Sequence, residues 1–308
     1  MSKDSEDSVQ RTDSSGLPVN ASLFTIFLCI LFGANAVAVK FSFTGLGIFT
    51  SAGVRFSVAA VTIFCWARLA GKPLAIRKSQ FSQLVLLALI FFVQLSLFFA
   101  GLNKTTASHG TLIANVLPFG VMLLAHVFVP GEVIVLKKFL GLILGFFGVI
   151  LLFFDSARFT AEMVTGDLMI LMAVGVWSCN AVYTKRIISD YHPIQITLYP
   201  MMMSSLLFLG CGFIFDDTMV RKIDPTIIKA MLYQIFVTAS FGMVAWNTLI
   251  RKYGATSLHS FVYIMPVSGV VLGVLMLGEP VTYNLIASLL LIATGLIIVN
   301  RDAKTKNK

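Results

Sequence analysis

The chain has 308 residues, of which 57% are hydrophobic and only 12% are charged, and its mean hydropathy is +0.90. A soluble domain carries roughly 25% charged residues, so this composition excludes an ordinary soluble protein and is typical of a protein whose surface faces lipid. The net charge of +9 does not indicate nucleic-acid binding, because the basic residues are spread between apolar segments.

The first 20 residues are polar, acidic and rich in serine, and we interpret residues 1–20 as a disordered cytoplasmic tail. Beyond them, apolar segments alternate with short polar connections, and each segment has about the 20 residues that are needed to cross a bilayer. The pattern predicts an all-α membrane protein with ten transmembrane helices, at 21–40, 46–69, 80–101, 107–129, 136–154, 166–187, 193–215, 228–250, 256–277 and 281–300. Residues 301–308 form a basic tail.

Lysine and arginine are distributed unequally between alternate connections. If the N-terminus lies inside, sixteen of them fall in cytoplasmic connections and tails, and five fall in connections on the other side. The positive-inside rule therefore predicts that both termini are cytoplasmic. The cysteines all lie in apolar segments, where a thiol behaves as a small hydrophobe, and we expect no disulfide, no metal site and no cofactor.

The second half of the chain repeats the first. ASHGTLIANVLP, from Ala107, matches ATSLHSFVYIMP, from Ala255, and the shared features that follow or precede this match keep offsets of 145 to 148 residues. Each half, 21–154 and 166–300, contains five predicted spans, so the halves are expected to lie in opposite orientations. Inverted repeats of this kind form a central site that opens alternately to each side of the membrane. The repeated positions, which we interpret as structural, are Asn35, Asn180, Pro118, Pro266, Glu132 and Glu279.

Two five-helix halves, each with a Pro…Gly-Glu…Gly-Val/Leu pattern, resemble the EamA-type branch of the drug/metabolite transporter superfamily. The resemblance covers about residues 22–300 and implies cytoplasmic termini, a bacterial inner (plasma) membrane, and export or exchange of amino acids or related small metabolites. The resemblance implies an aromatic residue followed by glycine in the first helix of each half. Phe32-Gly33 fits this pattern, whereas Trp177-Ser178 departs from it. An exporter of amphiphilic drugs and a lipid flippase share this fold and remain alternatives. An intramembrane enzyme is a more distant one, since neither a GxSx-type serine nucleophile with a histidine partner nor an HExxH motif is present.

Ionisable residues inside a bilayer are costly and therefore candidates for function. All fourteen aspartates and glutamates fall in tails, connections or span ends. This argues against a proton relay on a buried carboxylate and favours facilitated diffusion or exchange, with histidine-linked proton coupling as the second hypothesis. Arg55 is the deepest fixed positive charge, and it is expected either to pair with a substrate carboxylate or to bond carbonyls of a neighbouring helix. Lys40 is expected to extend to the membrane surface.

A small-molecule site needs a few polar groups among aromatic walls. For each candidate, packing between helices is the alternative to substrate binding. The predicted substrate-binding residues are Arg55, Gln94, Asn115, Trp177, Tyr199, Trp246, Asn247, Tyr263, His109 and His259.

Two further patterns concern packing and partners. Glu132 and Glu279 follow interfacial glycines and are expected to cap the helices that they precede, because a carboxylate stabilises a helix N-terminus. Gly141-x3-Gly145 fits close helix packing and is compatible with a homodimer. The predicted partners are a small-molecule substrate and the lipid bilayer.

Overall fold

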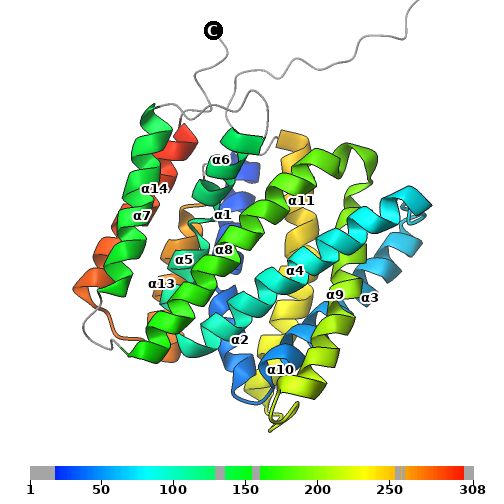
Figure 1. Ribbon diagram of the computed structural model, residues 1–308, viewed down its shortest axis with the longest axis horizontal. Coiled ribbons are helices and arrows are strands. Elements are labelled where there is room, and N and C mark those ends of the chain that lie inside the picture. Colours follow the sequence, from blue (N-terminus) through cyan, green and yellow to red (C-terminus); the bar gives the residue numbers. More distant parts are fainter. Residues whose placement is uncertain (1–17, 129–135, 155–159, 254–257, 259–260, 302–308) are drawn as a thin grey trace, which may run out of the picture.

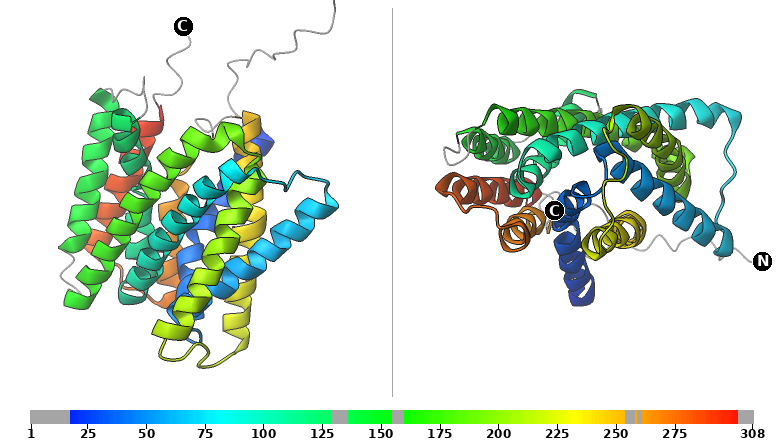
Figure 2. Two further views of the ribbon diagram at one scale, coloured as in Figure 1. Left: turned by 45° about the vertical axis from the view of Figure 1, so that its right-hand side comes forward. Right: turned by 90° about the horizontal axis from the view of Figure 1, so that it is seen from below.

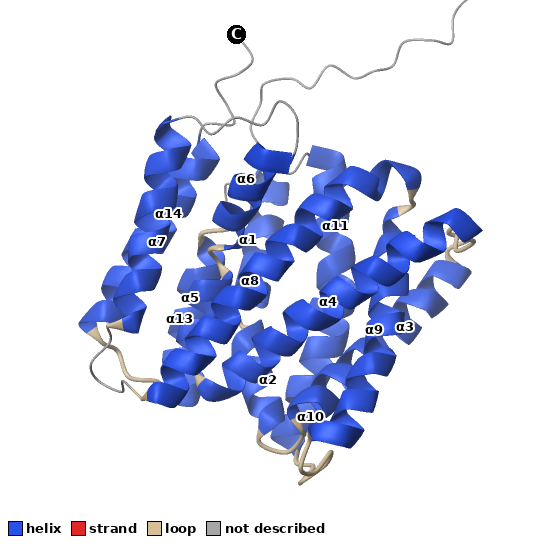
Figure 3. Cartoon of the chain, viewed as in Figure 1, coloured by secondary structure: helices blue, strands red, loops and turns tan. Residues whose placement is uncertain are grey.

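The computed structural model describes residues 18–128, 136–154, 160–253, 258 and 261–301. Within these ranges nearly all residues are helical, and short connections join the helices (Figure 3). The only extended pairing in the described ranges is an isolated bridge between Leu46 and Val220. The prediction of an all-α protein is confirmed.

The helices run back and forth between two faces of the molecule (Figure 1). We call the face at which α1 begins and α14 ends the terminal face, and the face at which α2 ends and α10 begins the opposite face. The described helices are α1 (Val19–Gly33), α2 (Asn35–Phe43), α3 (Ile48–Leu69), α4 (Lys78–Lys104), α5 (Ala107–Ala114), α6 (Leu117–Phe128), α7 (Leu136–Phe153), α8 (Ala161–Ile187), η2 (Ile188–Asp190), α9 (Pro193–Phe215), α10 (Pro225–Leu232), η3 (Tyr233–Gly242), α11 (Met243–Tyr253), α13 (Ile264–Leu277) and α14 (Tyr283–Arg301).

Seven helical segments are long and apolar enough to cross a membrane, and three shorter apolar helices accompany them. Many large apolar side chains on their outer surfaces are exposed, among them Leu206 at 68% and Val61 at 61%. Such a surface is unfavourable in water and favourable in lipid. The protein is therefore a multi-pass membrane protein. The long segments are 19–43, 48–69, 78–104, 107–128, 161–187, 194–215 and 225–246, and the short ones are 139–152, 264–277 and 283–299.

The tightest helix pairs join the two halves of the sequence. α7 packs along α14, α3 along α9, and α4 along α8. The α7–α14 pair and the α3–α9 pair lie at opposite ends of the molecule (Figures 1 and 2). The two halves are thus interleaved and share one main core, so neither half buries its apolar surface alone.

The glycine pattern of α7 is used inside the chain. A methyl group on Gly141 would lie 2.8 Å from the carbonyl oxygen of Gly295, and one on Gly295 would lie 2.6 Å from that of Gly141. A methyl group on Gly145 would lie 2.1 Å from the Phe119 ring. These glycines allow the α7 and α14 backbones to approach closely, whereas the homodimer stays an untested prediction.

Several of the apolar segments have an irregular backbone. The segment 107–128 divides into α5 and α6 at Asn115 and Val116, directly before Pro118. A corresponding turn precedes Pro266, which is the third residue of α13. Proline cannot donate a helical hydrogen bond and clashes with the preceding turn, so both breaks follow from the sequence. α1 and α2 are also separated, at Ala34, and η3 is a π-helix of ten residues.

Side chains from one half cap helices of the other on the opposite face. The Asp216 carboxylate, at the end of α9, accepts bonds of 2.8 Å from both the backbone N–H and the hydroxyl of Thr50 in the first turn of α3. Asp224 caps α10 locally, because its carboxylate accepts a 3.0 Å bond from the N–H of Ile227. That hydrogen bond holds the pKa of the Asp224 carboxyl below its ordinary value.

Candidate functional site

Arg55 lies on α3 and is buried, with 8% of its surface exposed. It is the eighth residue of the helix, which places it about 10 Å along the axis from the helix start at the opposite face. Its Nη2 donates a 3.3 Å hydrogen bond to the hydroxyl of Thr238, and its guanidinium lies 5.0 Å from the centre of the Phe56 ring. The Nε–H is buried without a hydrogen-bond acceptor among the described residues.

The groups around Arg55 are neutral and come from α2 and η3. The Thr238 hydroxyl lies 3.1 Å from Oδ1 of Asn35 and 2.9 Å from the carbonyl oxygen of Gln234, so its one proton goes to either acceptor. Gln234 donates from Nε2 to the carbonyl oxygen of Ala38 at 3.1 Å, and its Oε1 is buried without a donor among the described residues. We call Arg55, Asn35, Gln234 and Thr238 the Arg55 cluster.

The Arg55 cluster forms where two backbones depart from the regular α-helix. Asn35 follows the break between α1 and α2, and Gln234 and Thr238 lie on the π-helix. Irregular backbone at membrane depth is tolerated where it lines a cavity or is buried in protein, and π-helical turns are frequent at functional sites. The backbone geometry therefore marks the same place as the buried charge.

No carboxylate among the described residues neutralises the positive charge of Arg55. Over the described ranges the ion pairs involve Lys104, Lys222 and His109, and none involves Arg55. A buried charge without a counter-ion is costly in a membrane. Together with the unused Nε donor, this arrangement fits an anionic group that arrives with a ligand.

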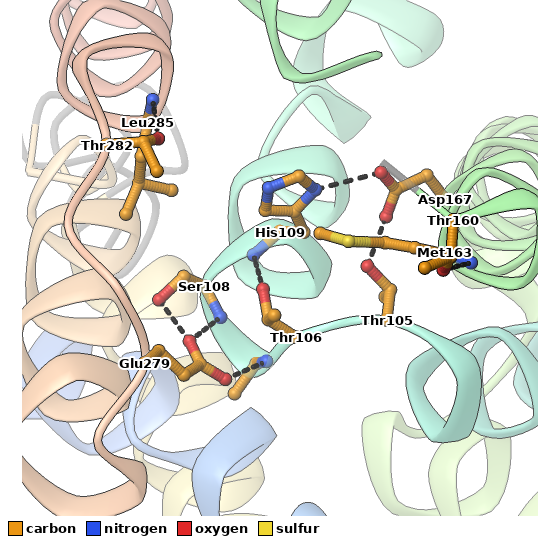
Figure 4. A network of polar contacts seen from close by, with 11 residues as sticks. Thr105, Thr106, Ser108, His109, Thr160, Met163, Asp167, Glu279, Thr282 and Leu285 are labelled. Carbon is orange, nitrogen blue, oxygen red and sulfur yellow. Dashed lines mark hydrogen bonds and ion pairs between the residues drawn. The ribbon is translucent and has the colours of Figure 1, made fainter. Parts of the chain in front are cut away.

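A second polar region lies near the opposite face, between α5 and α8 (Figure 4). Nδ1 of His109 on α5 lies 2.8 Å from Oδ2 of Asp167 on α8, and the two side chains are 4% and 2% exposed. Oδ1 of Asp167 accepts a 2.5 Å bond from the Thr105 hydroxyl. The expectation that no carboxylate is buried is therefore wrong: Thr160 caps α8 and extends it past the predicted start at 166, so Asp167 lies inside the helix.

Glu279 also belongs to this region and does not cap the helix that it precedes. Its carboxylate accepts bonds from the N–H of Ala107 at 2.5 Å, and from the N–H and hydroxyl of Ser108 at 2.9 and 2.5 Å (Figure 4). It thus caps α5, a helix of the other half, which corrects the expected partner. Lys40 does not extend to the surface either, because its Nζ donates to the carbonyl oxygens of Leu102 and Thr105, at 3.1 and 2.6 Å.

Gln94 and Asn180 form a contact that mirrors the one between Asn35 and Thr238. Nδ2 of Asn180 on α8 donates to Oε1 of Gln94 on α4 at 3.0 Å. In both cases an amide on the first helix of one half bonds the third helix of the other half. Gln94 thus contacts a helix of the other half, which is the alternative to substrate binding stated for each candidate.

Other predicted site residues lie away from Arg55. The Tyr199 hydroxyl donates to the carbonyl oxygen of Leu74, in the connection between α3 and α4. Trp246 packs edge-on against Phe32, with ring centres 5.9 Å apart. Asn115 donates to the carbonyl oxygen of Thr111 in its own helix.

Two other predicted residues, Trp177 and Tyr263, are half-buried and do not belong to the Arg55 cluster. Trp177 lies on α8, and Tyr263 packs on the main core beside the start of α13. His259, Glu132 and the side chain of Asn247 lie outside the described residues.

Three important residues escaped the sequence analysis. Thr238 and Gln234 are ordinary neutral residues in an apolar segment, although their spacing of four puts them on one face of a helix. Asp167 sits near the boundary of a predicted span and was therefore grouped with the surface carboxylates. The signal in the sequence was Thr160, because threonine is favoured at helix N-caps. In the structure its hydroxyl accepts a hydrogen bond from the N–H of Met163, which places the helix start before the predicted one.

Comparison with known proteins identifies the family. A model described as the EamA-like transporter family matches the chain twice, over residues 20–154 and 164–301. The chain belongs to this family. The resemblance inferred from the Pro…Gly-Glu…Gly pattern is confirmed.

Relatives of this EamA-like transporter match nearly the whole chain. This chain is 22% identical to the uncharacterized transporter YoaV of Bacillus subtilis (strain 168), over 91% of this chain and 96% of the relative. It is 26% identical to a probable amino-acid metabolite efflux pump of Escherichia coli (strain K12), over 90% and 93%. One crystal structure superposes with a TM-score of 0.68 at 18% identity, over 91% and 98%, which shows a common fold. The family and these names indicate a transporter and not an enzyme.

Proposed function

We propose that this EamA-like transporter is an alternating-access exporter or exchanger of amino acids or related small metabolites. One observation carries the proposal: a buried guanidinium, without a carboxylate partner in the described chain, lies where two irregular helices meet. A transport protein needs such a site inside the membrane, and its charge has to be balanced by the cargo.

The cluster suits the two charged ends of an amino acid. The guanidinium of Arg55 has a planar set of donors that matches the two oxygens of a carboxylate. Oε1 of Gln234 is a buried acceptor without a donor, which suits an ammonium group. That the Escherichia coli relative is named a probable amino-acid metabolite efflux pump supports the same cargo class.

Ten spans in two inverted halves form the proposed framework. The seven long segments and the three shorter apolar helices together account for ten crossings, and an odd number of spans in each half inverts the second. If the two halves are equivalent, α1 corresponds to α8, α6 to α13, α4 to η3 and α3 to α9. The contact of α1 with α13 then corresponds to that of α8 with α6, and the contact of α4 with α9 corresponds to that of η3 with α3. All four contacts are present, and the family model also matches the chain twice, which supports the duplication.

The proposed orientation has the terminal face in the cytoplasm and the opposite face outside an inner (plasma) membrane. The distribution of lysine and arginine supports it, since sixteen of the loop and tail cations fall on the proposed inner side and five on the other. The exit for the cargo would then lie on the opposite face.

Counterflow in proteoliposomes tests the proposal. Vesicles are loaded with a mixture of unlabelled L-amino acids, and single radiolabelled amino acids are supplied outside. We expect stereospecific accumulation of at least one amino acid, lost in Arg55→Gln protein and retained in Arg68→Gln protein, since Arg68 is an exposed residue near the end of the same helix.

A matched set of cargoes identifies the group that Arg55 binds. The amino acid that accumulates is compared with its carboxamide and with the amine that lacks the carboxylate. Competition by the acid alone supports a carboxylate contact. Equal competition by the amine, with Arg55→Gln protein still active, would contradict it and favour an exporter of amphiphilic cations.

A further inference from the structure

We infer that His109 and Asp167 form a proton-binding pair that couples movement of a proton to opening of the opposite face. The coupling to cargo rests on the proposed function, whereas proton binding by the pair does not. The inference concerns a site that lies apart from the Arg55 cluster and is built from different helices.

The pair is an ionisable unit shielded from solvent. His109 and Asp167 are 4% and 2% exposed at their side chains, with 2.8 Å between Nδ1 and Oδ2. The Thr105 hydroxyl fixes the other carboxylate oxygen, at 2.5 Å. Asp167 is the seventh residue of α8, so it lies about 9 Å along the axis from the start of that helix. A proton from the aqueous side therefore has a short distance to travel.

The charge of this pair changes by one when it binds a proton. With neutral imidazole, Nδ1–H donates to the ionised carboxylate and the pair carries one negative charge. With a proton added, imidazolium and carboxylate form an ion pair with no net charge, or the same proton resides on the carboxyl group. In a poorly solvated place this change alters the local electrostatic energy strongly.

The pair lies at a joint between the two halves. α5 belongs to the first half and α8 to the second, and Glu279 of the second half also caps α5. In alternating access one half moves against the other. A charge change at this joint therefore acts on the contact that has to separate when the opposite face opens.

Other charged groups near the joint have fixed partners. Lys40, from α2, donates to carbonyl oxygens at the end of α4. Glu279, from the connection before α14, is bound to the first turn of α5. Lys104 at the end of α4 pairs with Glu162 of α8 at 3.8 Å, and both are well exposed. Among the described groups, the pair thus brings an imidazole and a carboxylate into direct contact at a buried position.

A pH gradient across proteoliposomes tests coupling. Net transport of the exchanging amino acid is measured with and without an imposed gradient of one pH unit. For one proton exchanged per cargo molecule, we expect the accumulation ratio to change about tenfold. Asp167→Asn and His109→Gln proteins are expected to lose this response, so that their ratio stays near one.

Asp216→Asn protein is the matched control. Asp216 is likewise a carboxylate near the opposite face that bonds a helix of the other half, through Thr50, but it has no histidine partner among the described residues. It is expected to keep the gradient response. Exchange by the unmodified protein without any response to the gradient would overturn the inference and leave the proposed function intact.

Measurement of proton uptake tests proton binding by the pair and needs no cargo. The purified full-length protein and a His109→Gln/Asp167→Asn double variant are titrated in detergent between about pH 5 and 8. We expect the double variant to take up about one proton fewer, and the Asp216→Asn protein to match the unmodified one. Identical uptake by the double variant and the unmodified protein would show that the pair does not bind a proton, whatever the outcome of the transport assay.

Discussion

The Arg55 cluster and the region around α5 place charges inside the protein in opposite ways. In the region around α5, Glu279 accepts three hydrogen bonds and Asp167 has a partner at each oxygen. In the Arg55 cluster the guanidinium keeps an unused donor and Gln234 an unused acceptor. Satisfied carboxylates hold helices of the two halves together, whereas unsatisfied groups between irregular helices are suited to a ligand. Buried polar groups thus join the two halves in one region, and in the other they form the proposed binding site.

The sharpest test of this contrast is Arg55→Met. We expect exchange to fall by at least about thirtyfold, since truncation of a buried charged contact costs about 2–5 kcal/mol or more. The melting temperature should rise at the same time, because methionine fills the site without a buried charge. Counterflow and thermal unfolding in detergent measure the two effects. Arg68→Met is the control, and a lower melting temperature in Arg55→Met protein would show that Arg55 is a structural residue.

Glu279→Ala should have the opposite signature. It removes the side chain that caps α5, and we expect a loss of about 2 kcal/mol in the free energy of unfolding. Chemical unfolding in mixed detergent gives this value. Glu162→Ala, which removes an exposed partner of Lys104, should cost under about 1 kcal/mol. Equal costs for the two variants would mean that the bonds to α5 contribute little.

The two mirrored amide contacts separate binding from packing. Thr238→Val removes the hydroxyl beside Arg55 with little change of shape, and we expect KM for the cargo to rise about tenfold. Gln94→Leu breaks the equivalent contact with Asn180, and we expect a stability loss of about 0.6 kcal/mol with KM little changed. Saturation kinetics of exchange compare them. A larger KM effect in the Gln94 variant would move the site to the other half.

The smallest effect concerns a helix cap in water. The hydrogen bond from Ile227 holds the pKa of the Asp224 carboxyl in the folded protein below its ordinary value. The stabilising contribution of this carboxylate is therefore complete above the ordinary pKa of an aspartate and is lost as the pH falls through the lower folded pKa. Asp224→Ala should therefore lower the melting temperature slightly at about pH 7 and have a smaller effect at about pH 3. Scanning fluorimetry at both values tests this, and an undiminished difference at the acidic value would point to lost packing instead of the charge.

Local sequence determined much of this protein. The length of each apolar segment predicted the helices. The breaks before α6 and α13 likewise follow from Pro118 and Pro266, because the missing N–H acts within one turn. The family pattern was likewise readable in the residues around those prolines, and the family match confirms it. Arg55 was recognisable since a charge amid apolar residues is conspicuous in any window.

Only the tertiary structure decided the partners. Glu279 contacts residues more than 170 positions away, and Asp167 contacts His109 across 58 positions. No local window predicts which helix faces which, because that depends on how the two halves interleave and on small residues such as Gly141 and Gly295, which let backbones approach. The burial of Asp167 and the neutral surroundings of Arg55 follow from that packing, and with them the division between the joint at α5 and the proposed binding site at Arg55.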